Sequence, residues 1–487
     1  MTTSPAGDKL PNVNGLRDAQ PRHSLGYRVQ HRARTIVASV IAAMLVFSGT
    51  AAAATWLDVN GIIKNHSVEL IGQGSLDANT SIIDPNSGKP IEFVLIGQDS
   101  RDGEENQSVG GNFDDVVGNH QADTTMVAQI SADRTKINLV SIPRDSLVDV
   151  PQCETTNGTI PAQYNVMFNS IFANAYQTGG DLASAASCTL NAVNSLTGLN
   201  IQNFIVVDFA GLVKMINAVG GVDLCIPQDV DDPYTSLQLT KGLHHLDGYQ
   251  ATQYARTRHG LGDGSDTSRT TRQQYLIKQL MNEALSKNLF TDTAQLYQLA
   301  KSALQSLYIS QGMADTAALA GLAMSLKDFN LSNLYSQTVP VVSAPSDPNR
   351  SVWADEAETL WEKMRMDKPI YGSDESDTNT DADSAGNAGD STDNSTEGTD
   401  NTGSQEAAPT PDSVTGLITQ ADGTLIDPNT GGTVDPEDGS IHDALTGQYI
   451  GLADRYLNAT VCAVPEYIPT RCKWCRNGFL FGGYLYE

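Results

Sequence analysis

The sequence TTMVAQISADRTKINLVSI, residues 124–142, predicts the strand–turn–strand unit around which we expect the fold to be built. Its two halves, 124–130 and 136–142, are rich in Val, Ile and Thr, which favour strands. Residues 131–135 between them are short and polar, which is typical of a turn. The apolar run EFVLI at 92–96 indicates a further buried strand. We therefore predict an antiparallel meander of three strands.

The ends of these strands bring charged residues together. In a meander, the end of the first strand, the start of the second and the end of the third lie at one edge of the sheet. Asp99, Asp123 and Arg144 occupy these points, and Arg101 and Asp145 lie beside them. Two carboxylates there suit Mg²⁺, which takes one or two protein carboxylates together with water and phosphate oxygens. The alternative is that Asp99 and Asp123 only cap turns.

A second group of charges lies in DGYQATQYARTRHGLGDGSDTSRTTRQQ, residues 247–274. It contains Arg256, Arg258, Arg269 and Arg272, together with Asp266 and Gln273. The first two arginines are two positions apart, so on an extended segment they point to one side. The last two share a helical face with Gln273. Four guanidinium groups aimed at one place suit phosphate or pyrophosphate, whereas the alternative is a salt-bridged surface.

The overall charge excludes one class of partner. The chain has 487 residues, with 30 basic and 57 acidic side chains and a net charge of −27. A nucleic-acid-binding protein usually carries a basic stripe, so we expect no nucleic-acid partner. In so acidic a chain, general basicity does not explain a local cluster of arginines.

The N-terminal sequence predicts a membrane anchor. Residues 1–34 are polar and hold six Lys or Arg, and residues 35–57 are uncharged and long enough to cross a bilayer as a helix. Bases before the apolar run place the N-terminus in the cytoplasm and the bulk of the protein outside it. The alternative is a signal peptide cleaved near residues 51–54.

Six cysteines fit an oxidising compartment. They are Cys153, Cys188, Cys225, Cys462, Cys472 and Cys475. A Cys153–Cys188 bridge is the preferred pairing, although connectivity does not follow from sequence. The CxxC at 472–475 stands alone, so a local disulfide or free thiols are favoured over a redox or metal site.

Strands and helices alternate along residues 91–370, which predicts an α/β domain. Helices are expected at 164–176, 210–219, 267–287, 292–307, 315–327 and 354–366, and further strands at 204–209, 222–226 and 336–342. We expect a cytoplasmic tail (1–34), an anchor (35–57), a juxtamembrane segment (58–90), the main folded domain (91–370), an acidic disordered linker (371–412) and a small Cys-containing segment (413–487). The apolar helices either form plain core or enclose a lipid cavity.

Several motifs recur in an order that resembles the LytR-CpsA-Psr (LCP) family, actinobacterial type, over residues 91–290 with an extension to about 370. They are LIGQDSR (95–101), ADTTM (122–126), VSIPRDSLVDVP (140–151), NAYQTGG (174–180), VVDFAGL (206–212), AVGGVDLCIP (218–227), LDGYQATQYARTRH (246–259) and DTSRTTRQQ (266–274). The resemblance implies a central, mostly antiparallel sheet flanked by helices. It also implies a phosphotransferase outside the membrane, which moves a glycopolymer from a polyprenyl pyrophosphate carrier to peptidoglycan or a related wall acceptor.

The family resemblance also implies roles for the charged residues. Asp99 and Asp123 would hold Mg²⁺. Arg144, Arg256, Arg258, Arg269, Arg272 and Gln273 would surround the pyrophosphate, with Arg101 as a further candidate. Asp266 is the first candidate for the catalytic base and Asp145 the alternative. Many members carry Arg where this chain has Gln121, so one phosphate contact is either lost or replaced by Arg101.

Two other functions fit the same sequence. A pyrophosphatase would use the same site with water as the acceptor. A membrane-tethered regulator or scaffold would need no catalysis, but we find no helix-turn-helix pattern or basic stripe to favour it.

Overall fold

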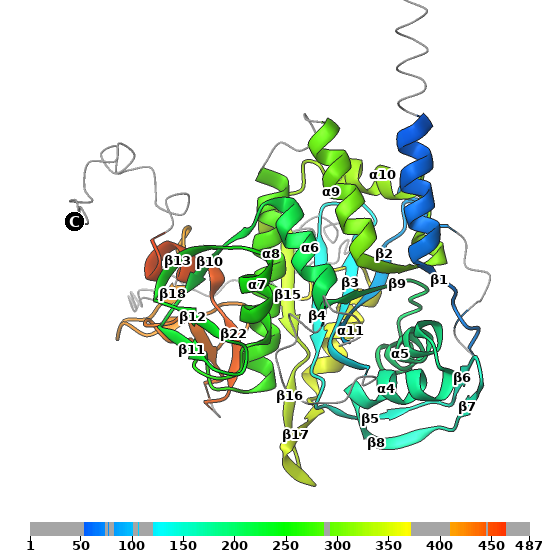
Figure 1. The fold of residues 1–487 in the computed structure, drawn as a ribbon. Helices are drawn as coiled ribbons and strands as arrows, with labels where there is room; N and C mark the ends of the chain where they lie inside the picture. Colours follow the sequence, from blue (N-terminus) through cyan, green and yellow to red (C-terminus); the bar gives the residue numbers. More distant parts are fainter. Residues whose placement is uncertain are drawn as a thin grey trace, which may run out of the picture. The chain divides into compact units, whose positions relative to one another are not determined.

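The predicted meander forms the centre of a seven-stranded sheet in the computed structural model (Figure 1). Strands β2 (Ile91–Asp99), β3 (Gln121–Ile130) and β4 (Ile137–Ile142) are antiparallel neighbours. The full order of strands is β1-β14-β9-β2-β3-β4-β15. The meander and its turn at 131–135 are therefore confirmed.

The structure describes residues 53–73, 76, 82–100, 106, 120–286, 293–371, 410–444 and 447–463. The expected anchor and acidic linker lie outside these ranges apart from their ends, as do Arg101, Cys472 and Cys475. Across the described ranges, no helix has both the length and the apolar character needed to cross a membrane. The chain divides into two compact units, 1–61 and 62–487, and everything below concerns the second.

The sheet is mixed, so the expectation of a mostly antiparallel sheet is wrong outside the meander. Three of its neighbouring pairs are parallel: β9 (Phe204–Asp208) with β2, β15 (Leu334–Thr338) with β4, and β1 (Ser67–Val68) with β14 (Leu307–Ser310). Strand β14 is antiparallel to β9. Two helices, α4 (Phe168–Gly179) and α5 (Leu182–Thr197), lie between β4 and β9 in the chain. Such a helical crossover returns the chain in its original direction, which produces parallel pairing.

Alternate residues of the central strands face two different layers. Val94, Ile96, Val127 and Val140 pack in a core with α4, α5 and α11 (Glu356–Arg365). Met126 and Leu139 face the opposite layer, which includes α8 (Asp266–Ser286) and α10 (Thr316–Ser325). This period-2 pattern buries both faces of the sheet.

The remaining elements surround this framework. The helices are α6 (Phe209–Val219), α7 (Gly248–Arg256) and α9 (Thr293–Ser306). Small antiparallel pairs are β5 (Leu147–Val150) with β8 (Gln163–Met167), β6 (Cys153–Thr155) with β7 (Gly158–Ile160), β10 (Val222–Ile226) with β13 (Gly242–Leu246), β11 (Val230–Asp232) with β12 (Leu237–Leu239), and β16 (Val341–Ala344) with β17 (Asp347–Trp353). The helix expected at 164–176 therefore begins later, because residues 163–167 pair with β5.

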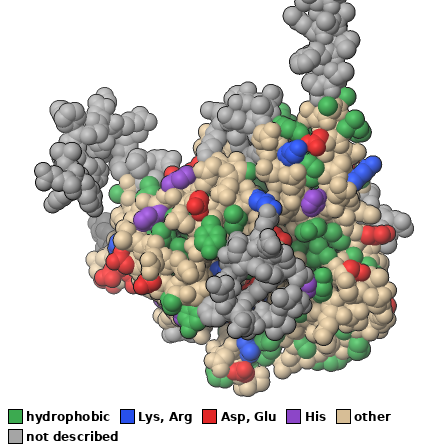
Figure 2. Space-filling view, in the orientation of Figure 1, with side chains coloured by type: hydrophobic (Ala, Val, Ile, Leu, Met, Phe, Trp, Pro, Cys, Tyr) green, Lys and Arg blue, Asp and Glu red, His purple; other side chains and the backbone are tan. Residues whose placement is uncertain are grey.

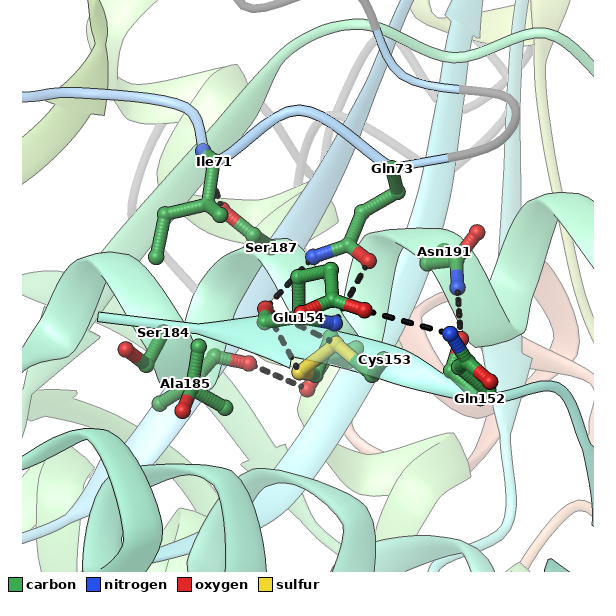
Figure 3. Close-up of a disulfide and its surroundings, with 12 residues drawn as sticks. Ile71, Gln73, Gln152, Cys153, Glu154, Ser184, Ala185, Ser187 and Asn191 are labelled. Atoms are coloured by element: carbon green, nitrogen blue, oxygen red, sulfur yellow. Dashed lines mark hydrogen bonds between the residues drawn. A yellow bond between two sulfur atoms is a disulfide. The ribbon is translucent and has the colours of Figure 1, made fainter. Parts of the chain in front are cut away.

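The preferred disulfide, Cys153–Cys188, is present and joins β6 to α5 (Figure 3). Gln73 lies beside it and exchanges two hydrogen bonds with the backbone of Glu154, at 2.7 and 2.8 Å. The Ile71 N–H donates to Ser187 Oγ at 2.9 Å. The folded region thus takes in residues before Ile91.

The small C-terminal segment forms a five-stranded antiparallel sheet. Its strands are β18 (Ile418–Thr419), β19 (Leu425–Ile426), β20 (Thr433–Val434), β21 (Ser440–His442) and β22 (Tyr449–Leu452), followed by α12 (Asp454–Tyr456). Lys278 of α8 pairs with Asp454, and the Tyr275 hydroxyl donates to Asn458 at 2.6 Å. A second disulfide, Cys225–Cys462, which we did not predict, ties this segment to β10.

Candidate functional site

A cavity of about 500 Å³ lies between one face of the sheet and helices α6, α7 and α8. Strand β2 contributes the alternate residues Leu95, Gly97 and Asp99, and β9 contributes Ile205 and Val207. This alternation follows from the pleat, because every second side chain points to the same face. Ile96, between Leu95 and Gly97, is buried in the core on the other face, whereas Gln98, beside a register shift, also lines the cavity.

The cavity is polar at one end and apolar along its walls. On α8, Arg269 and Gln273 of the first turns line it, followed by Leu276, Ile277, Leu280 and Met281 on the same helical face. Strand β2 changes in the same way, from Leu95 to Asp99. The remaining apolar lining includes Met126, Leu212, Met215 and Leu307. The cavity therefore suits a ligand with an anionic head and an apolar chain.

Asp123 enters the cavity from an irregularity in the sheet. The register of β2 with β3 shifts beside it, because Gly97 faces Thr124 whereas the next residue, Gln98, faces Ala122. A bulge of this kind redirects a side chain. Gly97 suits this position, since an added Cβ would lie 3.0 Å from Thr124 Cβ.

Two arginines hold the Asp123 carboxylate. Arg144 Nη1 donates to Asp123 Oδ1 at 2.8 Å, and Arg269 Nη1 lies 3.8 Å from Oδ2. Burial raises the pKa of Asp123, but Arg269 and Arg144 outweigh burial and lower it below the usual 3.8. Burial lowers the pKa of Arg144, but Asp123, Asp145 and Asp266 outweigh burial and raise that pKa above its usual value. Both groups thus stay ionised.

Asp266, at the first turn of α8, connects the two arginines. One oxygen accepts the Arg144 backbone N–H at 3.1 Å, and the other pairs with Arg269 of its own helix. Asp145 also lies near the Arg144 guanidinium, with Oδ1 3.7 Å from Nε. Neither acid is among the cavity-lining residues, yet both flank the Arg144 guanidinium.

Arg256 and Arg258 both line the cavity, as predicted, although Arg256 ends a helix rather than lying on an extended segment. A capping box of Asp247 and Gln250 begins that helix. The Arg256 guanidinium lies 4.4 Å from the centroid of the Phe209 ring. Burial, together with the nearby Arg269 and Arg144, lowers the pKa of Arg258 to about 10. An anion placed among these cations would therefore be favoured.

Gln273 lies at the polar end and is held by hydrogen bonds at 2.9 Å to Thr124 Oγ1 and 3.1 Å to the Ala255 carbonyl. Asp208 also lines the cavity, although we did not predict it, and caps α6 by accepting the Gly211 N–H at 2.7 Å. The sequence feature that could have indicated Asp208 is its place at the end of the predicted strand, in the VVDF motif at 206–209. Gln121 pairs with Asp99 across the strands and is not a lining residue.

Arg272 is not brought to the cavity, contrary to the prediction. Its guanidinium binds Ser268 Oγ at 2.7 Å and the carbonyl oxygens of Leu261 and Thr257. Successive helical residues turn by 100°, so Arg272 faces away from the direction in which Gln273 points. Burial lowers the pKa of Arg272 below its usual value. Arg272 therefore joins the end of α7 to α8.

Of the arginines that line the cavity, Arg269 is buried, whereas Arg144, Arg256 and Arg258 are partly buried. Their side chains are 18% exposed at Arg144 and 4% exposed at Arg269. On the face shown in Figure 2, the described Lys and Arg side chains lie apart from one another. The cationic end of the cavity thus offers a recessed site for a small anionic group.

Asp99 and Asp123 lie on adjacent strands and both line the polar end of the cavity. Two carboxylates beside a place for phosphate oxygens fit Mg²⁺, which keeps several waters and takes few protein ligands. Within the described residues, no group of three or more acidic, His or Cys side chains is arranged to hold a metal. The carboxylates of Asp99 and Asp123 therefore fit an ion that takes its remaining ligands from a bound substrate.

Comparison with known proteins gives a consistent set of matches. A sequence profile of the LytR_cpsA_psr family matches residues 60–366, which contain every residue that lines the cavity. The cell wall biosynthesis protein LcpA of Corynebacterium glutamicum is 28% identical over 324 residues, 64% of this chain and 60% of LcpA.

Two further matches are a curated transferase and a solved structure. The polyisoprenyl-teichoic acid–peptidoglycan teichoic acid transferase TagU of Enterococcus faecalis is 27% identical over 208 residues, 43% of this chain and 58% of TagU. The chain therefore spans about 60% of the length of the curated relatives that it matches. A solved LytR-Csp2A-Psr enzyme from Actinomyces oris is 19% identical, with a TM-score of 0.41, and covers 61% of this chain and 96% of that one.

Proposed function

Because the chain belongs to the LytR_cpsA_psr family, we propose that it transfers a glycopolymer from a polyprenyl pyrophosphate carrier to peptidoglycan or a related wall polymer. The new link is a phosphodiester bond. Relatives of the chain are named as cell wall biosynthesis proteins and as teichoic acid transferases that act with polyisoprenyl carriers and peptidoglycan. These names support the proposed class of substrate.

The observation that carries the proposal is the amphipathic cavity. Arg144, Arg256, Arg258 and Arg269 meet at the end where its walls change from apolar to polar. A polyprenyl pyrophosphate has the same division, with a diphosphate head on a hydrocarbon chain. Guanidinium groups bind phosphate oxygens in pairs, and the walls would remove part of the chain from water.

The reaction follows from these positions. The acceptor hydroxyl oxygen forms a bond to the phosphorus that bears the glycopolymer, and the bond from that phosphorus to the bridging oxygen breaks. Polyprenyl phosphate leaves, and the arginines stabilise its developing charge. Asp266, or alternatively Asp145, accepts the hydroxyl proton. Asp99 and Asp123 would hold Mg²⁺, which would neutralise charge on the phosphates.

The proposal places the reaction outside the cytoplasm. The two disulfides fit an oxidising compartment. The N-terminal apolar run, 35–57, would keep the catalytic domain beside the membrane that holds its lipid substrate. Such tethering raises the effective concentration of the carrier.

The test supplies the full-length protein in lipid vesicles with Mg²⁺, a lipid-linked radiolabelled glycan and purified wall fragments. Label that becomes attached to the wall through a phosphodiester bond supports the transferase. Free sugar phosphate without attached product would support the pyrophosphatase instead. Arg144→Ala should lower attachment by about 10²-fold or more, because it removes charge stabilisation from the reacting phosphates. Unchanged attachment in Arg144→Ala and in Arg256→Ala would favour a scaffold.

A further inference from the structure

Arg350 of the β16–β17 hairpin touches the site from outside the cavity, and no sequence motif pointed to it. Its Nη1 donates to Asp145 Oδ1 at 3.2 Å, and its Nε lies 3.9 Å from Asp347 Oδ2. The side chain of Arg350 is 33% exposed and that of Asp145 is 23% exposed. Arg350 thus binds an acid that also neighbours Arg144.

The hairpin is fixed to the loop that carries Arg144 and Asp145. Ser146 and Ser351 form a β-bridge, and their hydroxyl oxygens lie 3.3 Å apart. The Ser351 N–H also donates to the Asp145 carbonyl at 3.4 Å. Arg350 is therefore held in register beside Asp145 by backbone contacts rather than by its own side chain alone.

The Arg144 Nε–H is a buried donor without a hydrogen bond among the described residues. Two carboxylate oxygens lie close to Nε, at 3.7 Å in Asp145 and 3.5 Å in Asp266. Each of these oxygens has another cationic partner, Arg350 for Asp145 and Arg269 for Asp266. A buried N–H left unbonded is costly unless a ligand completes it.

We infer that Arg350 is a positioning residue that holds Asp145 away from Arg144, so that the Arg144 Nε–H stays available to a phosphate oxygen of the substrate. This inference rests on the proposed function and deepens it. Without Arg350, Asp145 would move the short distance to Nε, satisfy the donor and neutralise part of the Arg144 charge. The anionic head would then bind less tightly.

The test measures binding by isothermal titration calorimetry, with farnesyl pyrophosphate and inorganic pyrophosphate as probes and the full-length protein in detergent with Mg²⁺. Arg350→Ala should lower the affinity for both probes by about tenfold, which corresponds to the loss of one charge-assisted hydrogen bond. Arg350→Lys should lower the two affinities less, because it keeps the charge but loses the guanidinium fork. Asp347→Asn is the matched control, since it removes the other ion pair of Arg350, and should leave both affinities unchanged.

A double-mutant cycle separates this role from a direct or merely structural one. An uncharged Asn at position 145 cannot neutralise Arg144, so Arg350→Ala in the Asp145→Asn background should change either affinity by less than about twofold. A tenfold loss that persists in that background would overturn the inference, as would full affinity in Arg350→Ala. If Arg350→Ala does not fold, Arg350→Gln takes its place in the same cycle.

The binding readout keeps this inference apart from the reaction itself. Wild-type protein that binds both probes but attaches no glycan would overturn the proposed transfer and leave the cycle to decide the role of Arg350. Wild-type protein that binds neither probe would overturn the pyrophosphate site and the role of Arg350 together.

Discussion

Asp266 accepts the backbone N–H of Arg144 at 3.1 Å, although 122 residues separate them in the chain. This bond fixes the first turn of α8 against the loop that follows β4. The same carboxylate pairs with Arg269, so one acid orients two of the arginines at the cationic end of the cavity. Asp266 therefore has a positioning role whether or not it also accepts a proton.

Asp266→Asn separates these two roles. The amide oxygen still accepts the Arg144 N–H but is a far weaker base, so we expect transfer to fall by about 10²–10⁴-fold. The affinity for inorganic pyrophosphate should change only a few-fold. Initial rates of phosphodiester formation and calorimetric binding measure the two effects. An active Asp266→Asn beside an inactive Asp145→Asn would assign the base to Asp145.

Asp123 should make stability depend on pH. Its folded pKa lies below the usual 3.8, despite burial, because Arg269 and Arg144 stabilise the charged form. A lowered folded pKa contributes stability that is present above pH 3.8 and is lost as the pH falls through the folded pKa. Asp123→Asn removes a charged hydrogen bond, so at pH 7 we expect a loss of about 1.5–3 kcal/mol and a lower melting temperature.

The difference in melting temperature between wild type and Asp123→Asn should then narrow between pH 5 and pH 2. Differential scanning calorimetry at several pH values measures it. A difference of the same size at pH 7 and at pH 2 would contradict the assignment, because it would mean that the charge on Asp123 contributes nothing.

The apolar wall should bind the carrier chain. Met215 on α6 lines the cavity and is half-buried, so Met215→Trp would fill space without disturbing the core. We expect affinity for farnesyl pyrophosphate to fall about tenfold, whereas affinity for inorganic pyrophosphate stays the same. Lys214→Trp, at an exposed position of the same helix, is the control. Equal weakening of both probes would show that the change disturbs the phosphate site rather than the chain.

The sequence predicted those features of the site that depend on local pattern. The strand patterns along the sequence predicted the meander. The meander alone placed Asp99, Asp123 and Arg144 at one edge of the sheet. The strand at 204–209 was predicted, but its parallel pairing with β2 was not, because more than 100 residues separate the two strands in the chain. Helix α5 went unnoticed because its buried face consists of Ala, Ser, Thr and Asn as well as larger apolar residues.

Contacts between distant segments account for the other differences. Arg350 lies 205 positions from Asp145, and nothing in the pattern of the hairpin indicates that contact. The i, i+3, i+4 spacing predicted that Arg269, Arg272 and Gln273 share a face, but a helical face spans more than 100° and the cavity occupies only part of it. Whether a residue at the edge of a face reaches a site depends on the neighbouring packing.

Arg272 should accordingly act on stability rather than on phosphate binding. Its guanidinium is buried and binds two backbone carbonyls and the Ser268 hydroxyl. Arg272→Met keeps much of the volume but leaves these acceptors unsatisfied, which should cost about 3 kcal/mol and lower the melting temperature by several degrees.

Arg258→Met is the matched comparison, since Arg258 lines the cavity and its pKa is lowered to about 10 by burial and by its cationic neighbours. We expect Arg258→Met to weaken pyrophosphate binding with little change in melting temperature, as removing a cation from among cations relieves repulsion. Calorimetric unfolding and pyrophosphate titration of both variants measure the contrast. If Arg272→Met melts like the wild type but loses pyrophosphate, Arg272 belongs to the phosphate site after all.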